Sequence, residues 1–220
     1  MDILVAGGHG QVALRLLTIL AAQGHRARGL IRRPEQAADL TAAGAVPVIG
    51  DLENDPSLAE YVKGADAVVF AAGAGPGSGP ARKRTVDLGG AVKLVDAARA
   101  TGVRRYVMVS SIGAHRPDAA GQAMRPYLMA KAEADDYLRA SDLDWTVVRP
   151  GSLTDGSGTG RVRVSRELGD RGPVPRDDVA AVLAACLTAP ATIGVTFELF
   201  AGDTPIDEAL ASLAGPAAVS

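Results

Sequence analysis

The stretch Asp2-Ile3-Leu4-Val5-Ala6-Gly7-Gly8-His9-Gly10-Gln11-Val12-Ala13 at the start of the chain decides the fold. Its apolar run, Ile3 to Ala6, is typical of a parallel strand that is buried on both faces. A glycine-rich corner follows, and apolar residues at helical spacing begin at Val12. The stretch therefore predicts a strand, a tight turn and the start of a helix in direct succession.

The junction between this strand and this helix is a candidate anion site, because unpaired backbone N–H groups and the helix dipole converge there. Gly7 permits the tight turn, Gly10 allows a pyrophosphate to approach the backbone, and Ala13 lets the helix pack close to the strand. The same glycine pattern also occurs in turns that merely link a strand to a helix. The rest of the chain has to decide between these two interpretations.

Composition and charge narrow the class of protein. The 220 residues suffice for one domain with a substantial core, and 47% hydrophobic with 22% charged residues is ordinary for a soluble globular protein. The net charge of −2 gives no indication of a nucleic-acid or anionic-membrane partner. The single cysteine, Cys186, cannot form an internal disulfide, and no signal peptide or membrane span is visible. We expect a cytoplasmic protein.

Strands and helices alternate over the first 150 residues of the chain. The expected strands are 3–6, 26–31, 45–49, 65–70, 105–110 and 145–149, and the expected helices are 11–23, 35–43, 56–61, 82–100 and 126–140. Each connection is long enough for a crossover between parallel strands. We therefore expect an α/β fold with a doubly wound parallel sheet (a Rossmann fold), in which ligands lie beyond the carboxyl ends of the strands.

The last third of the chain is less regular. Residues 150–160 are rich in glycine and serine and predict a loop. Further elements are expected at 161–164 (strand), 176–187 (helix), 195–200 (strand) and 206–213 (helix). Because no linker separates two domains, we expect a single domain over 1–220, with a small substrate-side region from about 150 to 220.

Two arginines follow the second expected strand, where dinucleotide-binding proteins distinguish between cofactors. A site for NAD usually offers an acid to the ribose hydroxyls about 20 residues after the glycines. This chain has Arg32 and Arg33 there, and a guanidinium binds a 2′-phosphate with paired, charge-assisted hydrogen bonds. The sign of the charge favours NADP over NAD, and a solvated basic pair before a helix is the alternative.

Further cofactor contacts are expected at the ends of the third and fourth strands. Asp51 either accepts a hydrogen bond from the adenine amino group, with Leu52 covering the ring, or caps a turn. The small residues Ala71, Ala72 and Gly73 leave room for backbone to lie against the ribose.

A serine pair and a Tyr-x-x-x-Lys pattern follow the fifth strand. Ser110 and Ser111 stand at the end of the strand, whereas Tyr127 and Lys131 are four residues apart and share a helix face. A free phenol ionises at about pH 10, and a lysine ammonium beside it favours the phenolate, which creates an acid–base group. The same lysine can bind a nicotinamide ribose, and a serine hydroxyl can hold a substrate carbonyl. Alone, the Tyr-x-x-x-Lys pattern also occurs on solvated helix faces.

In this combination the chain resembles the short-chain dehydrogenase/reductase superfamily, in particular its short atypical NAD(P)-binding branch of NmrA-like and biliverdin reductase B-like proteins. The resemblance covers nearly the whole chain, and its motifs are Gly7-Gly8-His9-Gly10-Gln11-Val12-Ala13, Arg32-Arg33, Gly50-Asp51-Leu52, Val109-Ser110-Ser111, Tyr127 to Lys131, Trp145-Thr146-Val147-Val148-Arg149-Pro150-Gly151 and Arg176-Asp177-Asp178-Val179-Ala180. It implies a Rossmann fold, a bound NADP(H), and Ser111, Tyr127 and Lys131 as the candidate catalytic set.

The resemblance also implies a set of cofactor-binding residues. These are Gly7, His9, Gly10, Gln11, Val12, Arg32, Arg33, Asp51, Leu52, Ala71, Ala72, Gly73, Ser110, Lys131 and Pro150. His9 stands where the family usually has Ser or Thr, and Ala13 replaces the third glycine, but the contacts there come mainly from backbone. The longer C-terminal part with which extended relatives bind nucleotide sugars is lacking, so we expect a small substrate.

We predict an NADP(H)-dependent oxidoreductase that transfers hydride to or from a small carbonyl-type substrate. Tyr127 would be the acid–base group, Lys131 would favour its phenolate and hold the ribose, and Ser111 would orient the reacting oxygen. Two other classes stay open, namely a non-catalytic NADP-binding redox regulator and a flavin or quinone reductase. Substrate identity and oligomeric state do not follow from the sequence.

The three histidines do not suggest a metal site. His9, His25 and His115 lie far apart in the sequence without ligand spacing. We expect His115, which follows the fifth strand, to be a surface-loop residue rather than a contact of the substrate. Cys186 lies on an apolar helix face and predicts a packing role.

Overall fold

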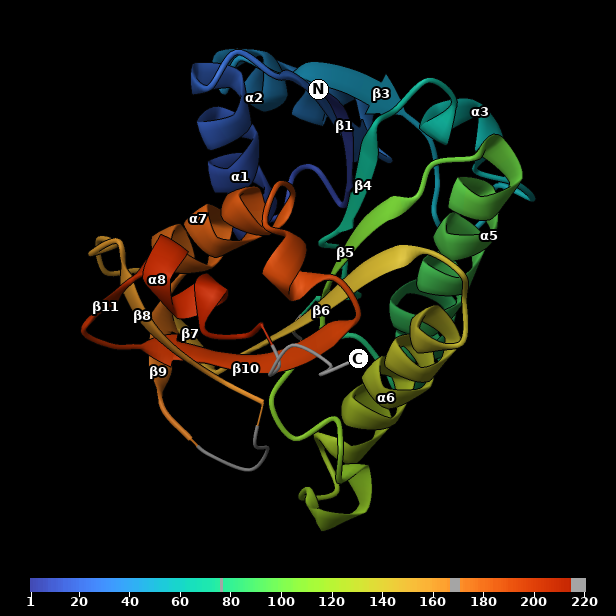
Figure 1. The fold of residues 1–220 in the computed structure, drawn as a ribbon. Coiled ribbons are helices and arrows are strands. Elements are labelled where there is room, and N and C mark those ends of the chain that lie inside the picture. The colour runs from blue at the N-terminus through green and yellow to red at the C-terminus, as the bar shows by residue number, and fades with distance from the viewer. Residues whose placement is uncertain (76, 167–170, 215–220) are drawn as a thin grey trace.

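The computed structural model of the protein describes residues 1–75, 77–166 and 171–214, and it consists of a sheet with helices on both faces (Figure 1). The strand order of this sheet is β11-β8-β10-β6-β5-β4-β1-β2-β3. Its strands are β1 (Asp2–Ala6), β2 (Arg26–Ile31), β3 (Val46–Ile49), β4 (Ala67–Phe70), β5 (Arg105–Val109), β6 (Asp144–Pro150), β8 (Arg161–Ser165), β10 (Val195–Ala201) and β11 (Thr204–Pro205). Neighbours from β3 to β10 are parallel, whereas β8 is antiparallel to both β10 and β11.

The helices divide between the two faces of the sheet. One face is covered by α1 (Gln11–Ala22), α2 (Ala37–Ala42), α7 (Arg176–Cys186) and α8 (Ile206–Ala211), and the other by α3 (Ala59–Val62), α5 (Ala91–Thr101) and α6 (Arg125–Arg139). The other helical segments are α4 (Pro80–Arg82), the π-helix η2 (Lys83–Gly90) and the 3₁₀ helices η1 (Pro34–Gln36), η3 (Pro117–Ala119) and η4 (Pro190–Thr192). This arrangement confirms the predicted doubly wound Rossmann fold.

Strand β1 shows why the parallel strands consist of consecutive apolar residues. Ile3 and Val5 pack into the core beneath α1 and α7, whereas Leu4 and Ala6 pack into the core beneath α5. Both faces are therefore buried, as expected for a parallel sheet covered by helices. The order of the strands reverses between β1 and β4, and such a switch point is where Rossmann folds bind dinucleotides.

The structure corrects several predicted elements. Residues 150–160 are not all loop, because β7 (Ser152–Thr154) pairs in parallel with β9 (Pro173–Pro175) in a second sheet. The expected helix at 82–100 is divided into α4, the π-helix η2 and α5, so its turns are not uniform. The expected strand at 195–200 is confirmed as β10, and its parallel pairing with β6 extends the sheet beyond the six strands expected in the first 150 residues. These pairings connect segments that are distant in the sequence, so no local sequence pattern predicts them.

The helix α7 is tied to α1 and to the loop before β8. The Arg15 side chain of α1 donates a 2.6 Å hydrogen bond from Nε to Asp177 Oδ1, and Asp177 Oδ2 accepts one from the Gly158 amide at 3.1 Å. The hydrogen bond from Arg15, more than any other contact, lowers the pKa of the Asp177 carboxyl. Asp177, in the first turn of α7, therefore connects this helix to α1 and to the loop before β8.

A buried ion pair fastens α6 to the sheet. Arg149 of β6 donates two hydrogen bonds, from Nε at 3.0 Å and from Nη2 at 2.9 Å, to Asp135 Oδ2, and the two side chains are 2% and 0% exposed. The Ser110 hydroxyl donates to the same oxygen at 2.8 Å. Burial raises the pKa of the Asp135 carboxyl, and Arg149 and Ser110 oppose that shift.

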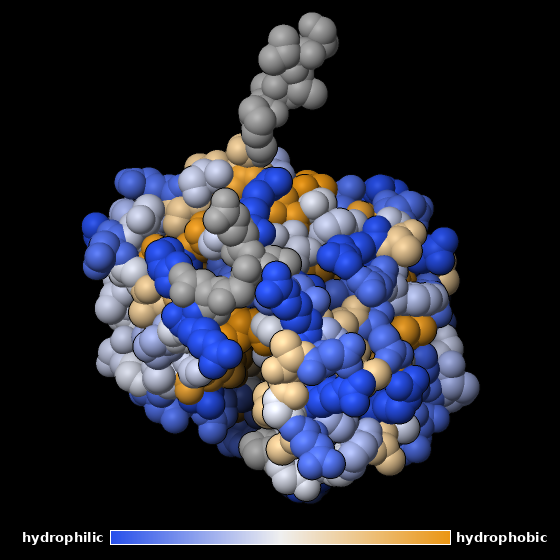
Figure 2. All heavy atoms as spheres, turned by 90° about the horizontal axis from the view of Figure 1, so that it is seen from below, coloured by the Kyte–Doolittle hydropathy of each residue, from blue (hydrophilic) through white to orange (hydrophobic). Residues whose placement is uncertain are grey.

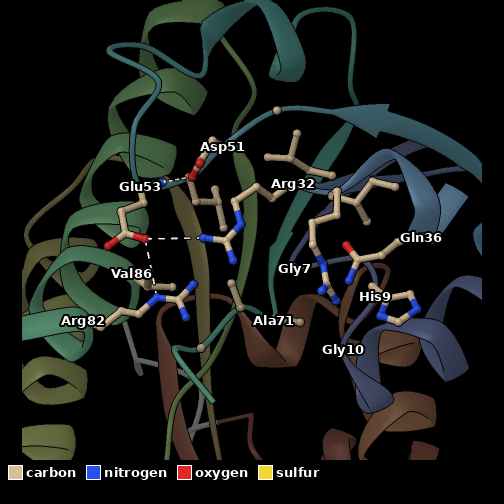
Figure 3. Close-up of a pocket in the computed structure, with 17 residues that line it drawn as sticks. Gly7, His9, Gly10, Arg32, Gln36, Asp51, Glu53, Ala71, Arg82 and Val86 are labelled. Atoms are coloured by element: carbon tan, nitrogen blue, oxygen red, sulfur yellow. Dashed lines mark hydrogen bonds and ion pairs between the residues drawn. The ribbon is translucent and has the colours of Figure 1, made fainter. Parts of the chain in front are cut away.

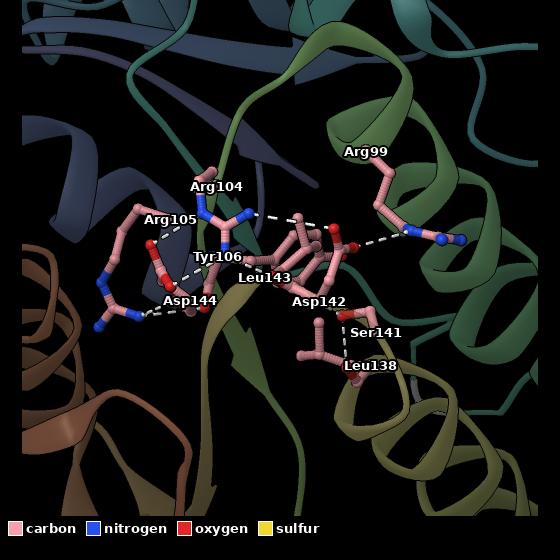
Figure 4. A network of polar contacts seen from close by, with 9 residues as sticks. All are labelled: Arg99, Arg104, Arg105, Tyr106, Leu138, Ser141, Asp142, Leu143 and Asp144. Carbon is pink, nitrogen blue, oxygen red and sulfur yellow. Dashed lines mark hydrogen bonds and ion pairs between the residues drawn. The ribbon is translucent and has the colours of Figure 1, made fainter.

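At the opposite end of the sheet, a network of exposed polar contacts joins α5, β5 and the loop before β6 (Figure 4). Arg104 Nη2 lies 3.4 Å from Asp144 Oδ1, and Arg99 Nε lies 3.1 Å from Asp142 Oδ1. Because these side chains are exposed to water, their attraction is screened and contributes little to stability.

The face of the molecule seen in Figure 2 is mainly hydrophilic, and its apolar side chains form separate patches. Large hydrophobic side chains that are exposed include Met124, Met129 and Leu153. Among the described residues, no helix has both the length and the apolar character needed to cross a membrane.

Replacing arginine by methionine should have different effects in the buried ion pair and in the exposed one. We expect Arg149→Met to lower the free energy of unfolding by about 3–5 kcal/mol, because it leaves the Asp135 carboxylate buried without its partner. Arg104→Met, which removes an exposed partner of Asp144, should cost less than about 1 kcal/mol. Urea denaturation of the two variants measures both values, and equal losses would contradict the assignment of Asp135–Arg149 as a pair shielded from water.

Candidate active site

A pocket opens at the carboxyl ends of the strands around the switch point (Figure 3). Residues from the ends of β1, β2, β3 and β4, and from the helical segment that follows β4, form its walls. They are Gly7, His9, Gly10, Leu30, Ile31, Arg32, Arg33, Gln36, Gly50, Asp51, Leu52, Glu53, Ala71, Ala72, Gly73, Arg82 and Val86. The position of the pocket agrees with the edge of the sheet at which the sequence predicts the cofactor.

The glycine corner forms one wall of this pocket. Gly7 has φ +81°, and a Cβ added to it would lie 2.6 Å from the Cα of Ala72, so no other residue fits without a shift of the backbone. Gly10 precedes the first turn of α1 and provides no side-chain cap, and its own amide donates to the Gly7 carbonyl at 2.8 Å. The first-turn N–H groups of α1 thus carry the positive end of the helix dipole, which suits a phosphate group.

His9 also lines the pocket, beside the glycine corner. Its Nε2 lies 2.7 Å from Asp39 Oδ2, and this contact holds the imidazole toward α2. A side chain anchored in this way leaves the backbone of the corner exposed to the pocket. The replacement of the usual Ser or Thr by His9 is therefore compatible with the cradle.

Both predicted arginines line the pocket, and Figure 3 shows the side chain of Arg32. Arg32 Nη1 lies 3.7 Å from Glu53 Oε2, and Arg33 Nε lies 3.7 Å from Glu35 Oε1. Both arginine side chains are about half exposed, so they are accessible to an anionic ligand. Gln36 adds an amide to the same wall, a residue that the sequence analysis did not single out.

The Asp51 carboxylate caps the turn that follows β3. Its Oδ1 accepts hydrogen bonds from the amides of Glu53 at 2.8 Å and Asn54 at 3.3 Å, and its Oδ2 accepts one from Asn54 Nδ2 at 2.9 Å. Burial raises the pKa of this carboxyl, but the hydrogen bonds and Arg32 outweigh it, so that the pKa is lowered overall. The structure shows the turn-capping role, and the contact of Asp51 and Leu52 with adenine stays a prediction.

Tyr127 and Lys131 both lie on α6, beyond the far end of the pocket. The Lys131 side chain is 4% exposed, and its Nζ donates to the carbonyl of Val109 at 3.2 Å and to that of Ala72 at 3.4 Å. The ammonium therefore lies between the ends of β4 and β5, next to a residue of the pocket wall. It is also 5.8 Å from the centre of the Tyr127 ring, which brings the two predicted catalytic residues together.

Two residues missed by the sequence analysis complete this group. Asp87, from the π-helix η2, is fully buried, and its Oδ1 lies 3.4 Å from Lys131 Nζ while its Oδ2 accepts the Ala74 amide at 3.1 Å. Lys83, from the same π-helix, places its Nζ 5.2 Å from the centre of the Tyr127 ring. The signal in the sequence for Asp87 is an acid between two apolar residues, in Val86-Asp87-Leu88.

The two adjacent serines have different surroundings. Ser110 is buried, and its hydroxyl is used by Asp135 in the core, away from the predicted nicotinamide side. Ser111 is half-buried, and its hydroxyl donates only to the neighbouring carbonyl of Ile112, at 3.1 Å. Of the two, Ser111 is thus the more available for a ligand. The Pro150 carbonyl accepts the Ile112 amide at 3.2 Å and so fixes the same loop.

The predicted cofactor residues divide into two groups. Those in the pocket wall are Gly7, His9, Gly10, Arg32, Arg33, Asp51, Leu52, Ala71, Ala72 and Gly73. Those outside it are Gln11, Val12, Ser110, Lys131 and Pro150. The wall residues that sequence reasoning missed include Gln36, Glu53, Arg82 and Val86, because no local pattern in the sequence distinguishes them.

His115 lies on the loop after β5 as expected, but it is less exposed than a surface residue. Its side chain is only 15% exposed, and its Nδ1 lies 3.9 Å from the buried Glu198 Oε1 of β10. Burial lowers the pKa of the imidazole, although Glu198 opposes this effect. Across the described ranges, no group of His, Cys, Asp and Glu is arranged to hold a metal ion. Cys186 is buried as predicted, which raises the pKa of its thiol to about 12.

The sequence matches a known protein family. The model of a family described as NAD(P)H-binding matches residues 7–190. The chain belongs to the NAD(P)H-binding family. The family's ligand is a nicotinamide cofactor, in agreement with the glycine cradle, and the predicted resemblance to the atypical short-chain dehydrogenases/reductases is confirmed.

Three proteins that this chain resembles match along nearly their whole length. The uncharacterized sugar epimerase YhfK of Bacillus subtilis is 41% identical over 215 residues, which cover 97% of this chain and 100% of YhfK. A solved structure from Bacillus halodurans, provisionally described as an NAD-dependent epimerase/dehydratase, is 42% identical with a TM-score of 0.92, covering 96% of this chain and 99% of that one. ChuY, described as an anaerobillin reductase from Escherichia coli O157:H7, is 25% identical with a TM-score of 0.75 and covers 92% and 98% of the two chains.

The close approach at the glycine corner predicts the effect of adding one methyl group. Gly7→Ala should lower the free energy of unfolding by about 1–3 kcal/mol more than Gly24→Ala, because its Cβ would overlap the backbone of Ala72. Gly24 has a similar φ of +77° but nothing within 4 Å of its added Cβ, so it controls for backbone strain alone. Urea denaturation gives the difference, and equal losses would show that the corner tolerates a side chain.

Proposed function

We propose that this chain is an NADP(H)-dependent oxidoreductase that transfers hydride between the nicotinamide and a small carbonyl-type substrate. The observation that carries the proposal is the place of Lys131, whose buried ammonium contacts the carbonyl of Ala72 in the pocket wall and lies beneath the Tyr127 ring. An acid–base group beside the expected nicotinamide end of a dinucleotide pocket suits carbonyl reduction.

The residues of the pocket fit a nicotinamide dinucleotide. The first-turn amides of α1 and the glycine corner would hold the pyrophosphate, and Arg32 and Arg33 would bind the 2′-phosphate. Ala72, Gly73 and their neighbour Ala71 would lie against a ribose, where only small side chains leave room. When bound, the cofactor supplies or accepts the hydride, which no side chain can do.

The chain's own residues would supply the proton chemistry. Tyr127 would donate a proton to the substrate oxygen in reduction and accept one in oxidation. The Lys131 and Lys83 ammonium groups lie 5.8 and 5.2 Å from the centre of its ring, and the Asp87 carboxylate contacts Lys131 at 3.4 Å. Ser111 would orient the substrate oxygen with its hydroxyl.

The names of two relatives favour epimerisation as a second candidate reaction, carried out by the same side chains. An epimerase of the type named for YhfK would use the same cofactor in both directions, with no net change in its oxidation state. Net oxidation of NADPH by a carbonyl substrate separates an oxidoreductase from such an enzyme. A non-catalytic redox regulator would bind NADP(H) without turnover, and a flavin or quinone reductase would transfer hydride without the Tyr127 proton. A cytoplasmic location stays a prediction.

The acid–base role of Tyr127 predicts a loss of turnover without a loss of binding. Tyr127→Phe should lower kcat for NADPH oxidation by a carbonyl substrate by about 10²–10⁴-fold, as expected for removal of a general acid. The affinity for NADPH, measured by fluorescence titration, should stay within about twofold, because the phenol acts on the substrate oxygen.

Tyr137→Phe is the matched control on the same helix. The Tyr137 hydroxyl donates to Asp96 Oδ1 at 2.7 Å on the exposed side of α6, so its loss should leave kcat unchanged. If Tyr127→Phe and the control turn over a carbonyl equally well, Tyr127 is not the acid. Retained turnover of flavin or quinone with no turnover of any carbonyl would favour the flavin or quinone reductase.

The arginine pair predicts a preference for the phosphorylated cofactor. Arg32→Ala should weaken NADPH binding by about 10- to 100-fold and NADH binding by less than about twofold, because only NADPH carries the 2′-phosphate. Arg26→Ala, which removes an exposed arginine at the other end of β2, should change neither dissociation constant. Equal weakening of both cofactors by Arg32→Ala would refute the phosphate assignment.

A further inference from the structure

Glu53 brings a carboxylate into a pocket that is otherwise suited to phosphate. It lies after β3, on the wall opposite the glycine corner, and its Oε2 faces two guanidinium groups (Figure 3). Arg32 Nη1 lies 3.7 Å from this oxygen and Arg82 Nε lies 3.5 Å from it. The three side chains come from different segments of the chain, yet they meet at one atom.

Residues other than the two arginines hold Glu53 in place. Its other oxygen, Oε1, accepts the Thr85 hydroxyl at 2.5 Å. Its backbone amide donates to Asp51 at 2.8 Å, and its carbonyl accepts Lys93 Nζ at 3.0 Å. Only Oε2 is left to the two arginines, and the carboxylate is fixed whether or not they stay.

The two arginines, by contrast, are held only by long and exposed contacts with this carboxylate. Their contacts with Glu53 are longer than the roughly 2.7–2.9 Å of charge-assisted hydrogen bonds. Their side chains are 47% and 42% exposed, whereas that of Glu53 is 24% exposed, so water screens both ion pairs. Weak pairs of this kind are readily exchanged for a stronger anion.

The geometry points to one site built from both arginines. We propose that Arg82 joins Arg32 and Arg33 in the 2′-phosphate site and that Glu53 is a resident counter-ion, which the cofactor phosphate displaces from the Arg32 and Arg82 guanidinium groups. This inference rests on the proposed function, since it assumes that the pocket binds NADP(H). It adds a specificity residue, Arg82, and a residue that limits the specificity, Glu53.

Distance and charge both support an exchange of this kind. Because Arg32 and Arg82 contact the same oxygen, their guanidinium groups are close enough for one phosphate to accept hydrogen bonds from both. A phosphomonoester carries about −1.5 to −2 charges at pH 7, against −1 for a carboxylate, so it attracts the arginines more strongly. Glu53 stays nearby after the exchange, and its negative charge repels the phosphate that replaced it.

This repulsion has a consequence for cofactor choice. The 2′-phosphate of NADPH would bind Arg32 and Arg82 but would also lie near the Glu53 carboxylate. NADH has no 2′-phosphate and would leave both ion pairs of Glu53 intact. Glu53 therefore weakens the binding of NADPH selectively. The ratio of the affinities for NADPH and NADH therefore depends on attraction by Arg32 and Arg82 and on repulsion by Glu53.

The test compares dissociation constants for NADPH and NADH, measured by isothermal titration calorimetry on the full chain. Glu53→Gln keeps an acceptor for Thr85 and should tighten NADPH binding by about 3- to 10-fold, with less than a twofold change for NADH. Arg82→Gln should weaken NADPH binding by about 5- to 30-fold, again with little change for NADH.

Arg84→Gln and Glu133→Gln are matched controls for charge. Arg84 Nη1 and Glu133 Oε1 form an ion pair of 3.3 Å, and neither residue lines the pocket. Each control removes the same charge as the corresponding test variant from the same region of the molecule. Both should leave the two dissociation constants within about twofold of wild type.

The outcomes separate this inference from the proposed function. If wild type binds neither cofactor, the proposed function fails and the inference fails with it. If wild type binds NADPH but Glu53→Gln leaves its affinity unchanged or lower, only the counter-ion role is refuted. If Arg82→Gln weakens NADPH and NADH equally, Arg82 contacts the shared pyrophosphate, and its assignment to the 2′-phosphate is refuted.

Discussion

The close approach of β1 and β4 at the switch point is the constraint on which the site depends. At Gly7 the two strand ends are so near that a single methyl group would overlap the backbone of Ala72. Because the order of the strands reverses there, the chain leaves β1 and β4 toward opposite faces of the sheet, and a crevice opens between the connections. The cradle for a dinucleotide is thus a direct result of how tightly the middle of the sheet is packed.

Buried charges fix the helix that carries Tyr127. Asp135 of α6 is bound by Arg149 of β6, and Lys131 of α6 lies against Asp87 of the π-helix. Burying such pairs is costly, so they add little net stability, but an α6 rotated about its axis would leave four charges without partners. The helix therefore has one orientation on the sheet. That orientation keeps the Tyr127 ring above an ammonium group.

Much of the fold was predictable because strands buried on both faces have to be apolar throughout, as Ile3 to Ala6 are. The glycine corner and the residues at the strand ends were predictable because backbone geometry restricts what can stand there. Glu53 and Arg82 were not, since a charged residue in a polar segment has the same local pattern whether it faces water or a pocket. The loop position of His115 was predictable, but its low exposure was not, because it depends on β10, which is placed by a long-range parallel pairing.

The contact between α1 and α7 bears on how this architecture can be altered. The helix whose amides form the cradle shares its apolar core with α7 and is bound to it through Arg15 and Asp177. The last third of the chain is therefore not a removable cap on a cofactor-binding unit. A chimera that takes this part from a relative must also take the matching face of α1, and specificity grafted without it would be lost to misfolding.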